Sequence, residues 1–168
     1  MKAWRQVPAA LRPLAAGLAA ALGLAGTGCG GSNAAPPIDS GPLYSCATEM
    51  RAVPYAPNLE RTSDAGTYKA VLVAADPAPP IKGNNTWTIE IRDANNIPVD
   101  ALTVTASANM RDHAHPPSVT PVATAAGHGR YTVTPLYLFM AGLWDITLTL
   151  QPAAGAKDTV LFPICIPG

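Results

Sequence analysis

A two-residue alternation of apolar and polar side chains is the strongest constraint that this sequence places on its fold. The alternation begins after Gly66 and is clearest in TWTIEIR, residues 86–92. There a tryptophan and two isoleucines alternate with Thr88, Glu90 and Arg92. Because successive side chains of a strand point to opposite faces of a sheet, this segment predicts a strand with one buried and one solvated face.

Six further segments resemble strands, and turn residues separate them. The seven segments are 68–74, 86–92, 101–108, 118–126, 130–138, 144–150 and 159–166. The fourth contains Pro121, which indicates an edge strand. About seven short strands in roughly 100 residues, with frequent turn signals and no competing helical pattern, predict an all-β, immunoglobulin-like β-sandwich. We expect Trp87 and Trp144 to fill its core.

The first 28 residues predict a lipoprotein signal peptide. A basic segment with Lys2, Arg5 and Arg12 precedes a short apolar run, residues 14–26. That run is shorter than the ~20 residues that a membrane-spanning helix needs. Small residues then precede Cys29, as in a bacterial lipobox, so we expect Cys29 to carry a lipid.

The lipobox is not a full match, because Gly26 stands where a leucine is usual. An ordinary signal peptide with an incidental cysteine is the alternative. Gly30 follows Cys29, whereas retention in the inner membrane usually requires Asp there. We therefore expect a lipid-anchored, periplasm-facing domain in the cell envelope, in the outer membrane if the organism is Gram-negative.

The mature chain divides into a linker and one domain. Residues 29–45 are rich in Gly, Ala, Ser and Pro and predict a flexible linker. Residues 46–168 form the predicted sandwich, with an extended arm before its first strand. Loss of the signal peptide leaves eight basic and eleven acidic residues, a formal net charge of −3. No basic cluster remains, which argues against a nucleic-acid partner.

The two remaining cysteines flank the predicted domain. Cys46 and Cys165 are 119 positions apart and have no Cys or His within three residues. This spacing argues against a redox CxxC motif or a thiolate metal site. In an exported protein the pair predicts a structural disulfide that ties the two ends of the domain together.

Several segments together resemble the YtkA-like, or FixH-like, periplasmic domain family. They are KGNNTWTIEIRDANNIPVDALTVTASANMRDHAH, GHGRYTV and LYLFMAGLWDITLTL, within residues 66–167. The resemblance implies an immunoglobulin-like fold, related in architecture to periplasmic copper carriers. It also implies a role near copper homeostasis or respiratory oxidase assembly.

A metal site is the chemistry that the sequence favours. His113 and His115 are two residues apart, so an extended backbone directs both imidazoles to one side, and Met110 adds a thioether nearby. Imidazole with thioether favours copper. The resemblance implies Met140 as a fourth ligand, although a methionine there could equally pack in the core. His128 lies between two glycines and is interpreted as a turn residue.

Two classes of function remain after catalysis is set aside. The sequence has no GxSxG motif, phosphate-binding glycine loop or persuasive carboxylate pair, so we do not expect an enzyme. The first class is a copper-binding lipoprotein that buffers metal or transfers it to a copper transporter or an oxidase-assembly protein. The second is a structural or protein-interaction module, in which the HAH segment is only a solvated turn.

Overall fold

The computed structural model describes residues 44–113 and 118–168. All of them belong to one compact unit, residues 39–168. The predicted signal peptide and residues 29–43 of the predicted linker lie outside the described residues. The elements are η1 Cys46–Thr48, β1 Leu59–Thr62, β2 Tyr68–Asp76, β3 Gly83–Asp93, β4 Thr103–Met110, β5 Val122–Gly127, β6 Arg130–Leu138, β7 Gly142–Gln151 and β8 Asp158–Ile166.

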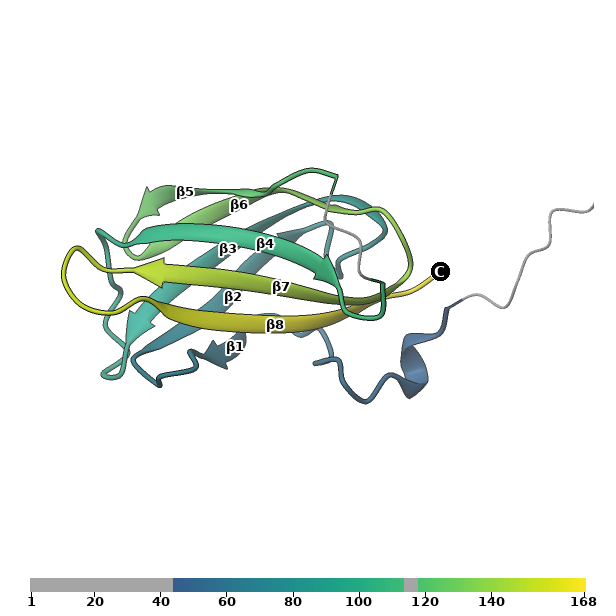
Figure 1. Cartoon of the computed structure of the whole chain (residues 1–168), viewed down its shortest axis with the longest axis horizontal. Coiled ribbons are helices and arrows are strands. Elements are labelled where there is room, and N and C mark those ends of the chain that lie inside the picture. Colours follow the sequence, from purple (N-terminus) through teal and green to yellow (C-terminus); the bar gives the residue numbers. More distant parts are fainter. Residues whose placement is uncertain (1–43, 114–117) are drawn as a thin grey trace, which may run out of the picture. The chain divides into compact units, whose positions relative to one another are not determined.

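The strands form two antiparallel sheets, one facing the other (Figure 1). The larger sheet has the order β1-β2-β3-β6-β5 and the smaller one has the order β4-β7-β8. The predicted all-β sandwich is therefore confirmed, and the seven predicted strands correspond to β2 through β8. Strand β1 is additional and comes from the predicted arm. No helix in residues 44–113 and 118–168 is long and apolar enough to span a membrane.

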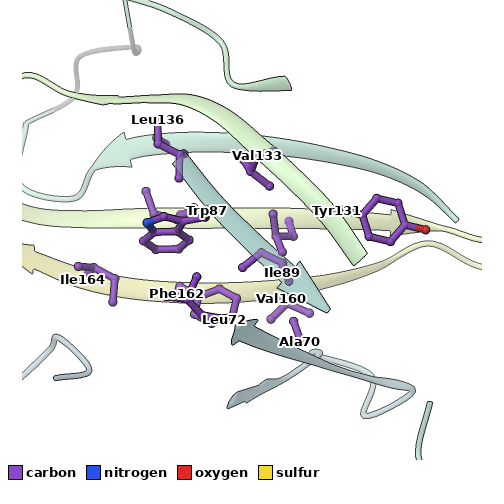
Figure 2. Close-up of a cluster of buried hydrophobic side chains, with 14 of the residues drawn as sticks. Ala70, Leu72, Trp87, Ile89, Tyr131, Val133, Leu136, Val160, Phe162 and Ile164 are labelled. Carbon is purple, nitrogen blue, oxygen red and sulfur yellow. The ribbon is translucent and has the colours of Figure 1, made fainter. Parts of the chain in front are cut away.

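The core lies between the sheets and contains the side chains that the alternation placed there. Trp87 and Trp144 are 0% and 1% exposed, as predicted. Trp87 from β3 meets Phe162 from β8 edge to face, with ring centroids 5.8 Å apart (Figure 2). Burial of such a side chain contributes about 1.5–3 kcal/mol, so these contacts join the two sheets firmly.

The outer face of β3 differs from the prediction at one residue. Glu90 was expected in solvent, but it is only 6% exposed. Arg92 on the same strand donates to Glu90 Oε1 at 2.7 Å, and Arg130 on β6 donates to Oε2 at 3.0 Å. Glu90 is buried because the two arginine side chains extend across it, a contact that the pattern of one strand cannot reveal.

The predicted arm packs along the sandwich and covers the free edge of β8. The amide of Val53 donates to the carbonyl of Pro163 at 2.7 Å, and the amide of Asp64 donates to that of Thr159 at 2.8 Å. Between them, Arg61 Nε donates to the carbonyl of Leu161 at 3.0 Å. These bonds satisfy edge carbonyls that would otherwise be open to another chain.

The two ends of the sandwich differ in what they carry. Strands β4, β6 and β8 finish at one end, where β3 and β7 begin. The chain also enters the sandwich there, because the carbonyl of Tyr44 accepts a hydrogen bond from the amide of Gly168 at 3.0 Å. We call this the entry end, which lies beside the marked C-terminus in Figure 1. The opposite end, with the β5–β6 hairpin, is the far end.

Candidate metal centre

Two segments that carry predicted ligands are joined at the entry end. Strand β4 ends at Met110, which lies opposite Trp144 near the start of β7. The next amide, that of Arg111, donates to the carbonyl of Leu143 at 3.0 Å. The ladder between β4 and β7 therefore brings the MRDH segment beside the MAGLW segment, although 30 positions separate Met110 from Met140.

Met110 lies inside the sandwich rather than in a loop. It is the last residue of β4 and is 5% exposed. Its Cε atom would be only 2.5 Å from a Cβ atom built on Gly142, where φ is +141°. A side chain at Gly142 would require the flexible end of Met110 to shift, and its φ lies in a region that residues other than glycine rarely adopt. Met110 has a packing role whether or not its sulfur binds a metal.

Met140 is the predicted ligand with the more accessible thioether. It lies in the corner between β6 and β7 and is 39% exposed. Its backbone is fixed, because its carbonyl accepts a hydrogen bond from the indole nitrogen of Trp144 at 3.0 Å. Phe139 packs edge to face against the same indole, with ring centroids 5.3 Å apart. The corner therefore presents the Met140 side chain to solvent from a rigid base.

The three histidines lie in different places. His113 is exposed, in the bend that follows β4 at the entry end. His115 lies outside the described residues, so its relation to His113 stays a prediction. His128 is at the far end, in the two-residue turn between β5 and β6, with a φ of +54°. Its interpretation as a turn residue is confirmed.

An ion-pair cluster that the sequence did not predict borders His113. Arg51 in the arm donates to both carboxylate oxygens of Asp112 at 2.7 Å and also to Glu49 at 2.7 and 2.8 Å. Hydrogen bonds from Arg51 lower the pKa of Glu49 to about 2. They also lower the pKa of Asp112. Residues 49 and 112 are far apart in sequence, so no local motif could have indicated this cluster.

A second ion pair fixes the base of the same loop. Arg111 donates to the two carboxylate oxygens of Asp145 at 2.6 and 2.9 Å. These bonds raise the pKa of Arg111. Because one bidentate pair holds Asp112 and another holds Arg111, the backbone that leads to His113 is anchored to both the arm and β7.

The predicted disulfide is confirmed, and it fixes the arm at this end. Cys46 and Cys165 are bonded, with Cα atoms 5.7 Å apart. Both cysteines line a pocket of about 190 Å³, together with Glu49 and residues 52–55 of the arm. The disulfide therefore holds the arm segment that supplies Arg51.

The described residues do not by themselves complete a metal-binding cluster of the common kind. Within residues 44–113 and 118–168 there is no group of three His, Cys, Asp or Glu side chains that could hold an ion. The predicted set of His113, His115, Met110 and Met140 depends on thioethers and on a histidine outside these ranges. It stays a prediction.

The comparisons with known proteins identify a family but no individual related protein. The family model described as YtkA-like matches residues 62–149. That range runs from the end of β1 to β7 and includes both segments with candidate ligands. No curated protein and no solved structure matches the chain. The FixH-like part of the predicted resemblance has no match of its own and stays a prediction.

Proposed function

This chain belongs to the YtkA-like family, and on that premise we propose that it is a lipid-anchored domain of the cell envelope that binds copper. The ion would be held at the entry end and buffered there or transferred to a copper transporter or an oxidase-assembly protein. Cys29 would carry the lipid.

One observation carries the metal proposal. The Arg111–Leu143 hydrogen bond joins the loop with His113 to the segment that begins with the exposed Met140. His113 and Met140 therefore belong to joined segments at one end of the sandwich, where loops usually carry binding residues, and this supports the proposal. His115, two positions after His113, supplies the second nitrogen donor. Soft sulfur beside imidazole favours copper over hard cations such as Mg²⁺ or Ca²⁺.

The exposed fractions of the two methionines favour Met140 over Met110 within this proposal. Met140 is 39% exposed and Met110 is 5% exposed. A ligand must reach the ion without emptying the core, so Met140 is the stronger thioether candidate. Met110 would bind the ion only from the core side of the site, and its side chain would have to shift within the packed end of β4.

Copper titration of the purified mature chain tests the metal proposal. The double variant His113→Ala/His115→Ala should abolish Cu(II) binding, because it removes both nitrogen donors. His128→Ala is the matched control, because it removes a histidine from the far end and should leave binding unchanged. Copper binding by the double variant at parental affinity would refute the site.

The thioethers need a separate comparison. Met140→Ala should weaken Cu(I) binding more than Cu(II) binding, because sulfur prefers the softer ion. At Met110 the suitable change is Met110→Leu, which removes sulfur but keeps the volume at a cost below about 1.5 kcal/mol. We expect a smaller loss of Cu(I) affinity from Met110→Leu than from Met140→Ala. The opposite ranking would reverse the assignment.

Membrane attachment is tested independently of copper. Cys29→Ala should release a soluble or uncleaved form, because residues 29–168 contain no apolar run of the ~20 residues that a membrane-spanning helix needs. Normal processing with unchanged membrane fractionation would contradict the lipid proposal.

A second candidate function is a protein-interaction module without metal, and strand β5 favours it. Strand β5 is an edge strand of the larger sheet, and five of its six residues are exposed. The arm covers the edge of β8, whereas β5 presents an edge that an extended peptide could join. This function becomes the better one if neither copper ion binds the parent chain.

A further inference from the structure

The exposed apolar side chains are distributed unequally between the two ends. Seven large apolar side chains among the described residues are at least 36% exposed, and four of them lie at the entry end, namely Met50, Ile81, Tyr137 and Met140. Val122 lies opposite Thr134, midway along β6, and Val119 is in the segment that leads to β5. Ile97, which is 59% exposed, lies in a turn at the far end. Single exposed apolar residues are common on soluble proteins, but a concentration at one end indicates a contact surface.

Ordered backbone holds these side chains in place. Met50, which is 90% exposed, lies in the arm between the Cys46–Cys165 disulfide and Arg51. Ile81 is held by Asn85, which accepts from its amide at 3.0 Å and donates to its carbonyl at 2.8 Å. Tyr137 lies opposite Asn84 in the ladder between β3 and β6. The apolar groups are therefore presented by a fixed frame around the end.

The charges at the same end are nearly balanced and mostly paired with one another. Segments at this end carry three basic residues, Arg51, Lys82 and Arg111, and four acidic ones, Glu49, Asp76, Asp112 and Asp145. Arg51 pairs with Glu49 and Asp112, and Arg111 pairs with Asp145. Such an end has little attraction for a strongly charged partner, so its occupant is better sought among neutral, amphipathic surfaces.

We propose that the entry end docks on a lipid bilayer, with its exposed apolar side chains in the interfacial region. The proposal rests on the lipid anchor at Cys29, and the argument comes from where the chain enters the sandwich. Residues 30–43 connect Cys29 to Tyr44, which is bonded to Gly168 at this end. Even a fully extended 14-residue segment spans at most about 50 Å, so the domain stays close to the membrane.

The tether and the apolar groups have different roles. Attachment at Cys29 keeps the domain at a high local concentration near the bilayer, so even weak contacts become populated. The apolar groups then select the orientation, because only this end offers several of them together. Tyr137 suits the interface, since a phenol has an apolar body and a polar tip. The candidate ligands His113 and Met140 lie at the same end, so metal bound there would be exchanged at the membrane surface.

The test uses hydrogen exchange on the mature chain, residues 29–168, attached to vesicles through Cys29. Because Cys46 and Cys165 form a disulfide, Cys29 is the remaining thiol, and it can be coupled to a maleimide phospholipid in phosphatidylcholine vesicles. The reference is the same chain in solution, with Cys29 blocked by a small maleimide. We expect amides in residues 81–84 and 137–141 to exchange at least threefold more slowly on vesicles, and those in residues 94–97 to be unchanged.

A pair of variants separates the two ends. Met50→Ser/Ile81→Ser/Tyr137→Ser should abolish the slowing, whereas Ile97→Ser should retain it. The triple variant leaves every candidate metal ligand in place, so its copper titration should match that of the parent chain. Slowing should also persist in 0.5 M salt, because paired charges contribute little attraction.

The outcomes distinguish this proposal from the function above. Two results would overturn the docking proposal and leave a protein as the occupant of this end. The first is that attachment to vesicles changes the exchange rates of the two ends equally, relative to the chain in solution. The second is that the slowing at the entry end survives in the triple variant. Because the coupling to vesicles is chemical, this result does not depend on natural lipidation. Mass spectrometry of Cys29 from cells tests the natural anchor, and copper titration tests the metal site.

Discussion

The turns of the far end are shaped by neighbours in sequence, whereas the arm and the loop with His113 at the entry end are held by residues far apart. At the far end, Asp93 accepts hydrogen bonds from the amides of Asn95 and Ile97, and His128 and Gly129 close a hairpin with positive φ angles. At the entry end, one disulfide spans 119 positions and the Arg51–Asp112 pair spans 61. The candidate chemistry lies at the second end, where local sequence says least about structure.

The largest expected loss of stability comes from removing the Cys46–Cys165 disulfide, which joins residues 119 positions apart. The variant Cys46→Ala/Cys165→Ala opens a 119-residue loop, which in the chain-entropy model lowers the free energy of unfolding by roughly 4 to 5 kcal/mol. For a domain of this size the melting temperature should fall on the order of 10 to 20 °C. Calorimetry measures the fall, and hydrogen exchange should show the arm released before the far-end turns. Equal loss of protection at both ends would remove the contrast between them.

The next effect is at the far end and depends on one glycine. Gly129 has a φ of +70°, and a Cβ atom there would lie 2.7 Å from the carbonyl oxygen of Ile91 and 2.9 Å from Pro98 Cβ. Gly129→Ala should cost about 2 to 4 kcal/mol, from backbone strain and from overlap. Gly127→Ala is the control, because φ is +79° there but no atom lies within 4 Å. Chemical denaturation should rank Gly129→Ala as clearly the more destabilised variant.

A smaller effect is expected from the tyrosine that spans the far end. Tyr131 is 3% exposed, and its hydroxyl bonds the amide and the carbonyl of Leu102 at 3.2 and 3.3 Å. Tyr131→Phe leaves those buried backbone groups without this partner, which costs about 1 to 2 kcal/mol. Tyr137→Phe, on the exposed residue of the same strand, should change the free energy of unfolding by less than about 0.5 kcal/mol. Similar values for the two variants would contradict the role given to Tyr131.

The success of the fold prediction has a local cause. Each long strand carries its own alternation, and each turn carries its own Gly, Pro, Asn or Asp, so the sequence near a residue determines its element. Strand β1 was missed because LERT, residues 59–62, is only four residues long. It becomes a strand through pairing with β2, in which Leu59 lies opposite Leu72. Burial of Glu90 was missed for a similar reason, because one of the arginines that cover it comes from another strand.

The candidate site could be predicted only in part. Extending the two-residue alternation of this strand to residue 110 would have placed Met110 in the core. Val104, Ala106 and Ala108 face the core, and Met110 continues their alternation. The predicted strand stopped at residue 108, which left Met110 in a loop. The Arg51–Asp112 pair had no such signal, because its partners lie in an arm without periodicity and in a loop. Side-chain pairs of this kind follow from the fold rather than from a motif.

Arg51→Met should break the contact between the arm and the loop with His113, with little loss of global stability. Arg51 is 48% exposed and Asp112 is 42% exposed, so solvent screens their attraction. Pairs of this kind contribute about 0.2 to 1 kcal/mol. Hydrogen exchange should nevertheless quicken in residues 49–53 and 111–113, because their shared contact is gone. Arg111→Met is the control, since it breaks the pair with Asp145 and should leave the arm unchanged.

Acid should weaken the hold of Glu49 on the arm at the entry end, and this is the smallest effect that we expect. Hydrogen bonds from Arg51 lower the pKa of Glu49 from its ordinary value of 4.5 to about 2. A carboxyl group with a lowered pKa stabilises the folded state fully above its unfolded pKa, and that contribution is lost as the pH falls through the folded pKa. The Glu49 contribution should therefore be complete above about pH 4.5 and decline toward pH 2. Carboxyl NMR can follow Glu49 across this range while amide exchange follows residues 44–52. In Arg51→Met the titration of Glu49 should move back toward 4.5. If Glu49 in the parent chain already titrates near 4.5, the ion pair does not hold the arm in solution, and the disulfide alone distinguishes this end from the other.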